Sequence, residues 1–69
     1  MNLKRLRNLR EDNDLTQEQV AKILNTTQQQ YYKYEKGIQD IPVRHLITLA
    51  EYYGVTIDYI IGMTNEEHN

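Results

Sequence analysis

Apolar residues recur at intervals of three and four along most of the chain, and the breaks between these runs fall at residues that favour turns. This spacing is typical of amphipathic helices, whereas a half-buried strand would alternate apolar and polar residues. We therefore predict five helices, over residues 2–13, 16–24, 27–36, 42–53 and 56–61. With short connections and no strand pattern, the sequence predicts an all-α fold in one compact domain over residues 1–64, followed by a short acidic tail over 65–69.

Residues that cap helices mark several of these boundaries. Thr16 and Thr27 are each followed three residues later by a glutamine, which is the capping-box pattern, and Thr56 can cap the last helix. Gly37 stands where the third helix should end in a left-handed residue. Pro42 is expected within the first turn of the fourth helix, where proline is tolerated.

The apolar stripes of the predicted helices are expected to meet in a single core. They comprise Leu3, Leu6, Leu9, Val20, Ile23, Leu24, Tyr31, Tyr34, Leu46, Leu49, Ala50 and Tyr53. Tyr32 falls outside the stripe of its helix and is expected at the surface. His45 is likewise expected on a helix surface.

The net charge of −2 is unfavourable for binding nucleic acid, because that binding depends on Lys and Arg neutralising phosphates. The distribution of charge changes this picture. Residues 1–10 carry four bases and no acid, and residues 11–18 carry four acids and no base, so a basic and an acidic face can coexist.

Several function classes find no support in the sequence. The chain has no cysteine for a disulfide or a thiolate metal site, and its two histidines stand far apart. No apolar run is long enough to span a membrane, and no nucleophile–base arrangement or glycine-rich phosphate loop occurs. We expect a cytoplasmic protein that is not an enzyme and needs no metal or small-molecule cofactor.

Residues 16–36 carry the pattern that points to function. Only Asn25 and Thr26 separate two short capped helices, and so tight a joint forces a steep helix-turn-helix crossing. Asn25 suits the sharp turn because asparagine tolerates a left-handed backbone. Ala21, with its small side chain, lets the second helix approach the first closely.

The second helix of this pair has an unusual exposed side, since it opens with three glutamines. The N-terminal residues of such a helix are the ones that reach base edges in DNA. A glutamine amide both donates and accepts, which matches the N6/N7 edge of adenine, so Gln28 and Gln29 are candidate base contacts. Gln17 and Thr27 are candidate phosphate contacts.

The segment resembles the Cro/repressor (XRE-type) helix-turn-helix family, including the DNA-binding domains of phage repressors. The family pattern, roughly Leu-Ser/Thr-Gln-x-x-Leu-Ala, a turn, and a Ser/Thr-started helix ending in Glu-x-Gly, is met by Leu15, Thr16, Gln17, Val20, Ala21, Thr27, Glu35 and Gly37. The stretch from Leu46 to Gly62 is similar to the rest of the five-helix, lambda-repressor-like domain of that family.

The resemblance implies further roles. Tyr32 and Lys33 would contact bases beyond the two glutamines, and Arg10 and Arg44 would contact phosphates. Arg10 would also form an ion pair with Glu35. The implied function is a transcriptional regulator, of the repressor kind, that binds a near-palindromic double-stranded DNA operator as a homodimer. Four residues near the C-terminus are candidates for the dimer interface, or equally for side chains that cover the hydrophobic core: Ile57, Ile60, Ile61 and Met63.

Other functions stay open at this point. The net negative charge and the small number of basic residues after Gly37 also fit a protein–protein interaction module on the same fold. An antitoxin-type autoregulator would also use this domain, because fold alone does not fix function.

Overall fold

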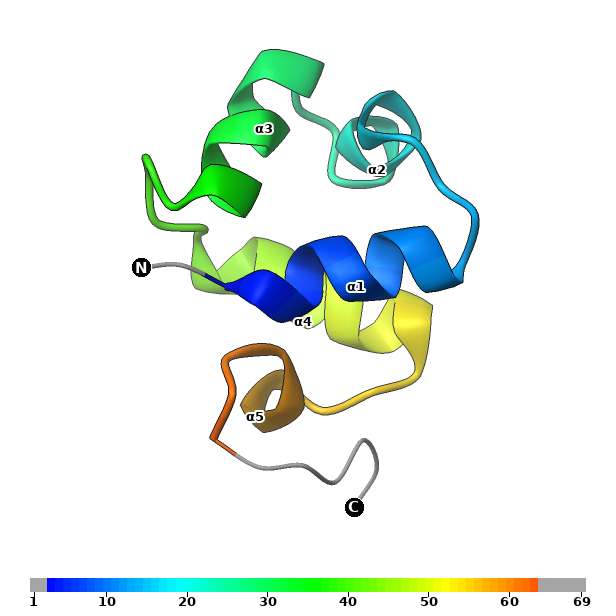
Figure 1. Cartoon of the computed structure of the whole chain (residues 1–69), viewed down its shortest axis with the longest axis vertical. Coiled ribbons are helices and arrows are strands. Elements are labelled where there is room, and N and C mark those ends of the chain that lie inside the picture. Colours follow the sequence, from blue (N-terminus) through cyan, green and yellow to red (C-terminus); the bar gives the residue numbers. More distant parts are fainter. Residues whose placement is uncertain (1–2, 64–69) are drawn as a thin grey trace.

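The computed structural model describes residues 3–63, and all regular secondary structure in that range is helical (Figure 1). The helices are α1 (Lys4–Asp12), α2 (Gln17–Ile23), α3 (Gln28–Lys36), α4 (Val43–Tyr53) and α5 (Ile57–Ile60). The predicted all-α, five-helix fold is confirmed. The proposed acidic tail over residues 65–69 lies outside the described residues.

The predicted threonine caps are present and set the helix starts. Thr16 Oγ1 accepts a hydrogen bond from the Gln19 N–H at 3.1 Å, and the Gln19 side chain accepts one from the Thr16 N–H at 2.8 Å. This capping box satisfies two donors at the start of α2. Thr56 likewise caps α5 by accepting from the Tyr59 N–H.

The predicted box at α3 is only half formed. Thr27 Oγ1 accepts from the Gln30 N–H at 3.1 Å, as expected. The Gln30 side chain, however, donates to the Gln39 side chain instead of forming the return half of the box. Pro42 also differs from the prediction, since it is the cap of α4, in an extended conformation with ψ 148°, and not a residue of its first turn.

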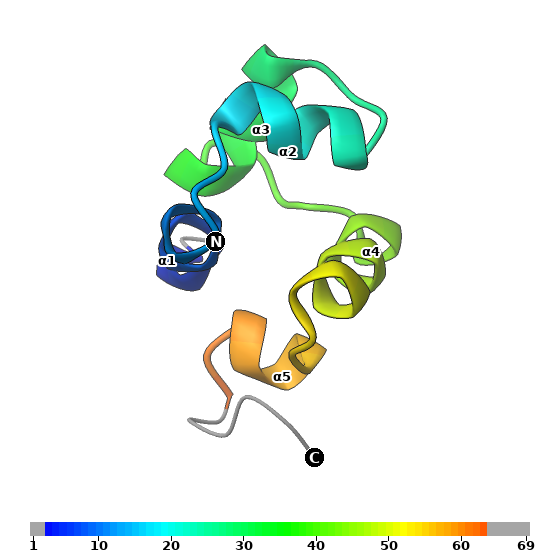
Figure 2. The same cartoon turned by 90° about the vertical axis from the view of Figure 1, so that its right-hand side faces the viewer.

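Each helix contributes one side chain to the centre of the core. These side chains are Leu6, Val20, Tyr31, Leu49 and Ile60, all nearly or completely inaccessible to solvent. In two perpendicular views, α2 and α3 lie together at one end of the molecule, α5 lies at the other, and α1 and α4 lie between them (Figures 1 and 2). The other three helices, α1, α4 and α5, thus support α2 and α3.

One sequence-based placement is wrong, and one that the sequence left open is decided by the structure. His45 was expected at the surface but is buried, with its ring centroid 5.9 Å from that of Tyr34 on α3. Burial and the nearby Arg44 cation lower the pKa of His45. Ile60, expected either at a dimer interface or as a residue covering the core, is 1% exposed and belongs to the core. Ile57 and Ile61 are partly buried, whereas Met63 is exposed.

No helix within residues 3–63 is both long and apolar enough to cross a membrane.

Candidate nucleic-acid interface

The joint between α2 and α3 is a tight turn that fixes how the two helices cross. Asn25 adopts the left-handed conformation expected of it, with φ 58°. The next N–H, that of Thr26, returns to the carbonyl of Ala21 at 2.9 Å and closes the end of α2. Ala21 is 2% exposed and lies within the packed region of the core. The turn therefore presents α3 in one orientation.

The α3 helix has two faces of different chemistry. Tyr31, Tyr34 and Glu35 are buried against the rest of the domain. The opposite side is exposed and carries two amides, a phenol ring and two ammonium groups: Gln28, Gln29, Tyr32, Lys33 and Lys36. Since packing requires only the first face, the second is free to contact a ligand.

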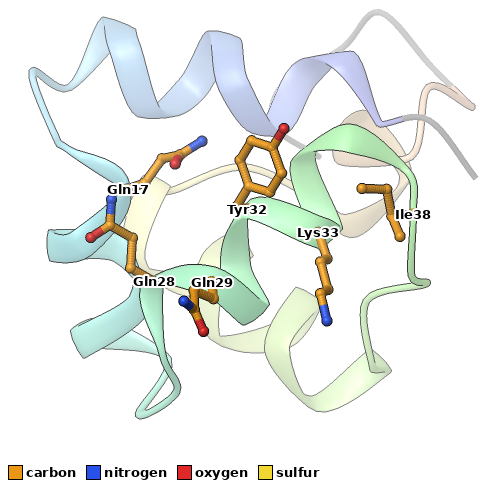
Figure 3. Close-up of a pocket in the computed structure, with 6 residues that line it drawn as sticks. All are labelled: Gln17, Gln28, Gln29, Tyr32, Lys33 and Ile38. Atoms are coloured by element: carbon orange, nitrogen blue, oxygen red, sulfur yellow. The ribbon is translucent and has the colours of Figure 1, made fainter.

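Five predicted DNA contacts line one surface hollow of about 360 Å³ (Figure 3). Gln17 reaches it from α2, and the four predicted base contacts, Gln28, Gln29, Tyr32 and Lys33, reach it from α3. The structure thus brings together side chains from both helices of the motif. Such an open, mixed polar and apolar surface suits the edges of stacked bases better than it suits a small ligand, which binds in an enclosed pocket.

Ile38 completes the hollow and was missed by the sequence analysis. It follows the left-handed Gly37, and its N–H donates to the carbonyl of Lys33 at 2.9 Å, which folds the chain back over the end of α3. Its side chain is 63% exposed. A large aliphatic residue directly after a helix-ending glycine, among polar neighbours, was the available signal.

Three other predicted contacts lie outside this hollow. Thr27 is exposed at the start of α3, and its hydroxyl oxygen already accepts the capping hydrogen bond. Arg44 is exposed in the first turn of α4. Arg10 is largely enclosed, with 14% of its side chain exposed, and donates through Nη1 to the carbonyl of Leu15 at 3.0 Å.

Glu35 is the point at which α1, α2 and α3 are joined behind the exposed face. Its Oε1 accepts from Arg10 Nε at 2.6 Å and from the Tyr31 hydroxyl at 2.9 Å. Its Oε2 accepts from Gln17 Nε2 at 2.9 Å and, more weakly, from Arg10 Nη2 at 3.4 Å. The ion pair with Arg10 is therefore part of a larger network, in which Gln17 links the carboxylate to the hollow.

The network keeps this buried carboxylate charged. Burial by itself would raise the pKa of Glu35, but the hydrogen bonds from Arg10, Gln17 and Tyr31 outweigh burial and hold its pKa below the ordinary value. The hydrogen bond to Glu35 raises the pKa of Arg10. Burial, followed by the adjacent carboxylate, raises the pKa of Tyr31, so its hydroxyl stays a donor.

Basic side chains flank the exposed face of α3. Lys4 and Arg7 on α1 line a second, smaller depression together with Lys36 and Glu35. The Lys36 ammonium also lies 5.7 Å from the centroid of the Tyr32 ring. These cations lie beside α3 although the chain as a whole is acidic. Within residues 3–63, no group of three or more His, Asp or Glu side chains is placed to bind a metal ion.

Comparisons with known proteins agree with this geometry. A family model described as helix-turn-helix matches residues 6–60. The chain is 38% identical, over 96% of its length, to an uncharacterized HTH-type transcriptional regulator, YobD, of Bacillus subtilis, of which it covers 59%. It is 37% identical, over 84% of its length, to the cryptic phage CTXphi transcriptional repressor RstR of Vibrio cholerae, of which it covers 52%.

A third relative is the uncharacterized HTH-type transcriptional regulator RC0668 of Rickettsia conorii, which is 39% identical over 81% of this chain and 45% of the relative. The chain thus spans about half the length of the curated relatives it matches. No solved structure matches it significantly.

Proposed function

This chain belongs to the helix-turn-helix family, and from that membership we propose that it is a sequence-specific, double-stranded-DNA-binding transcriptional regulator of the repressor kind. The observation that carries the proposal is the exposed face of α3, on which Gln28, Gln29, Tyr32 and Lys33 meet Gln17 at one surface. Folding gives no reason for these exposed amides, whereas DNA recognition does.

In the proposed complex, α3 lies in the major groove with its N-terminal end toward the bases. The amides of Gln28 and Gln29 pair with the N6/N7 edge of adenine, and Tyr32 and Lys33 contact bases further along the groove. Gln17 and the capping residue Thr27 contact phosphates, with the backbone N–H groups that begin α2 adding to that contact.

The two arginines have different roles in this proposal. A phosphate contact by Arg10 would compete with its ion pair to Glu35 and its bond to Leu15, so we assign Arg10 the structural role. Arg44, exposed at the start of α4, remains a predicted phosphate contact.

We further propose that the chain acts on DNA as a homodimer. One such module contacts only a few base pairs, so useful specificity needs two, on a near-palindromic operator with half-sites roughly 34 Å apart. The longest dimension of the fold is 31 Å, which allows two copies to lie side by side at that spacing. Met63, with Ile57 and Ile61 beside it, remains the candidate interface.

The proposed regulator would act in the cytoplasm, where a bacterial or phage operator lies.

Selection from a random duplex pool tests the proposal directly. We expect recovery of a two-fold symmetric site with adenines in each half, and loss of that preference for Gln28→Ala or Gln29→Ala. Asn8→Ala is the control, because Asn8 carries an exposed side-chain amide on α1 and does not line the hollow. If no sequence is enriched, the proposal is wrong, and the same face would be assigned to a protein partner, as in an interaction module.

A further inference from the structure

We infer that the hollow on α3 contains a thymine-methyl subsite, in which Tyr32 and Ile38 contact the C5-methyl group of one thymine in each half-site. This inference rests on the proposed function and specifies what the apolar part of the surface recognises. It adds Ile38 as a specificity-determining residue that no sequence motif indicated.

The first argument is the exposure of two large apolar side chains in one hollow. Tyr32 is 43% exposed and Ile38 is 63% exposed, and both line it. A single exposed apolar residue is ordinary on a protein surface. Two of them in one hollow, rimmed by Gln17, Gln28 and Lys33, form a patch of the kind that marks an interaction site.

The second argument is chemical complementarity. Among the base edges in the major groove, thymine presents the apolar methyl group, whereas the other exposed groups are hydrogen-bond donors and acceptors. An A·T pair places that methyl on the strand opposite the N6/N7 edge that a glutamine amide matches. A surface combining amides with an apolar patch is therefore complementary to A·T pairs in particular.

The third argument is position along α3. Tyr32 follows Gln28 by four residues and Gln29 by three, so all three share a face of the helix, with Tyr32 about one turn, roughly 5 Å, further along (Figure 3). Ile38 lies beyond the helix end, held there by its hydrogen bond to the Lys33 carbonyl. The contacted thymine should lie within about two base pairs of the adenine read by the glutamines.

The size of the effect follows from burying one methyl group. Removing a methyl from an apolar contact weakens binding about fourfold. The effect is large enough to measure and small enough to leave binding to the rest of the operator intact.

Deoxyuridine substitution tests the subsite, because uracil differs from thymine only by lacking the methyl group. Each thymine of the selected operator is replaced in turn, and binding is measured by fluorescence anisotropy. We expect one position per half-site at which the wild-type protein binds about fourfold more weakly. That difference should shrink to less than twofold for Tyr32→Ala and for Ile38→Ala.

Two matched variants control for the loss of an exposed apolar side chain as such. Tyr52→Ala and Ile47→Ala remove a tyrosine and an isoleucine that are 52% and 44% exposed on α4 and do not line the hollow. Both should keep the full sensitivity to deoxyuridine.

Two results would overturn the subsite and leave the proposed function standing. One is equal binding of every deoxyuridine duplex and the parent operator. The other is an undiminished methyl effect in both Tyr32→Ala and Ile38→Ala. If the wild-type protein does not prefer the selected operator to a scrambled duplex, the proposed function fails, and the subsite with it.

Discussion

Arg10 Nε and Glu35 Oε1 lie 2.6 Å apart in an ion pair that joins α1 to α3, with 14% and 4% of the two side chains exposed. A pair this enclosed differs from the exposed pairs of the same molecule, since neither charge can easily recover its hydration if the other is removed. Because Gln17 and Tyr31 donate to the same carboxylate, the pair fixes both helices of the motif relative to α1.

Replacing Glu35 with glutamine tests the importance of this charge. We expect Glu35→Gln to lower the free energy of unfolding by about 3 kcal/mol, because it leaves the Arg10 cation without its counter-charge in a largely enclosed position. Urea denaturation followed by circular dichroism measures the change. Glu11→Gln is the matched control, since the Arg7–Glu11 pair has side chains 61% and 52% exposed and should contribute less than about 1 kcal/mol. Equal losses in the two variants would contradict the assigned role.

The burial of His45 predicts a dependence of stability on pH. Burial, with the charge of Arg44, lowers the pKa of His45 in the folded state below its ordinary value of 6.5. The unfolded chain therefore binds a proton more readily than the folded one, and the free energy of unfolding should fall as pH falls below about 6.5. His45→Gln should remove this part of the pH dependence. If the wild type and His45→Gln show the same pH dependence of the free energy of unfolding between about pH 5 and about pH 7, this prediction is wrong.

A second loss of stability should follow at lower pH. The pKa of Glu35 is held below its ordinary value of 4.5, so this carboxylate contributes stability that is present above that value and is lost as the pH falls through the lower, folded-state pKa. Glu35→Gln should flatten the stability profile below about pH 4.5. Thermal melts at a series of pH values give the measurement.

The left-handed turn at Asn25 makes a separate prediction about the joint of the motif. Asn25→Ala should lower the free energy of unfolding by about 1 kcal/mol, because a Cβ without a polar side chain is disfavoured at φ 58°. Asn25→Gly should stay within about 0.5 kcal/mol of the wild type. As a control, Asn8→Ala in the exposed middle of α1 should be neutral or slightly stabilising. Equal stability of Asn25→Ala and Asn25→Gly would count against the turn geometry as the cause.

The charge on Lys33 predicts how DNA binding responds to salt. If Lys33 lies at the DNA surface, Lys33→Gln should reduce the slope of log affinity against log salt by up to about 1, measured between about 50 and 200 mM salt. Lys22→Gln is the control, because Lys22 is exposed on α2 and does not line the hollow. Its Nζ lies 3.7 Å from Glu18 Oε1 on the same helix. A reduction of the slope in the control alone would assign the DNA face elsewhere.

Local sequence signals predicted most of the fold. The threonine caps, Gly37 and the left-handed Asn25 act through neighbouring backbone groups, so a sequence pattern contains nearly all the necessary information. The helix boundaries differ from those predicted by at most two residues. The starts of four helices differ by one residue because Thr16, Thr27, Pro42 and Thr56 precede them as caps.

The predictions that were wrong or missing depend on contacts between elements distant in sequence. His45 was expected at the surface, but it is buried, with its ring against that of Tyr34 on another helix. The side chain of Gln30 bonds to Gln39 beyond the end of α3, which no capping pattern could indicate. Ile38 joins the candidate site only because the chain folds back after Gly37.

The two faces of α3 separate the requirements of folding from those of the DNA recognition that we propose. Tyr31, Tyr34 and Glu35 hold the helix from within, whereas Gln28, Gln29 and Tyr32 stand on the outside. Mutations on the outer face can therefore accumulate with little loss of stability. If α3 reads the operator as we propose, a few substitutions on its outer face would change the DNA sequence that is bound and leave the fold intact.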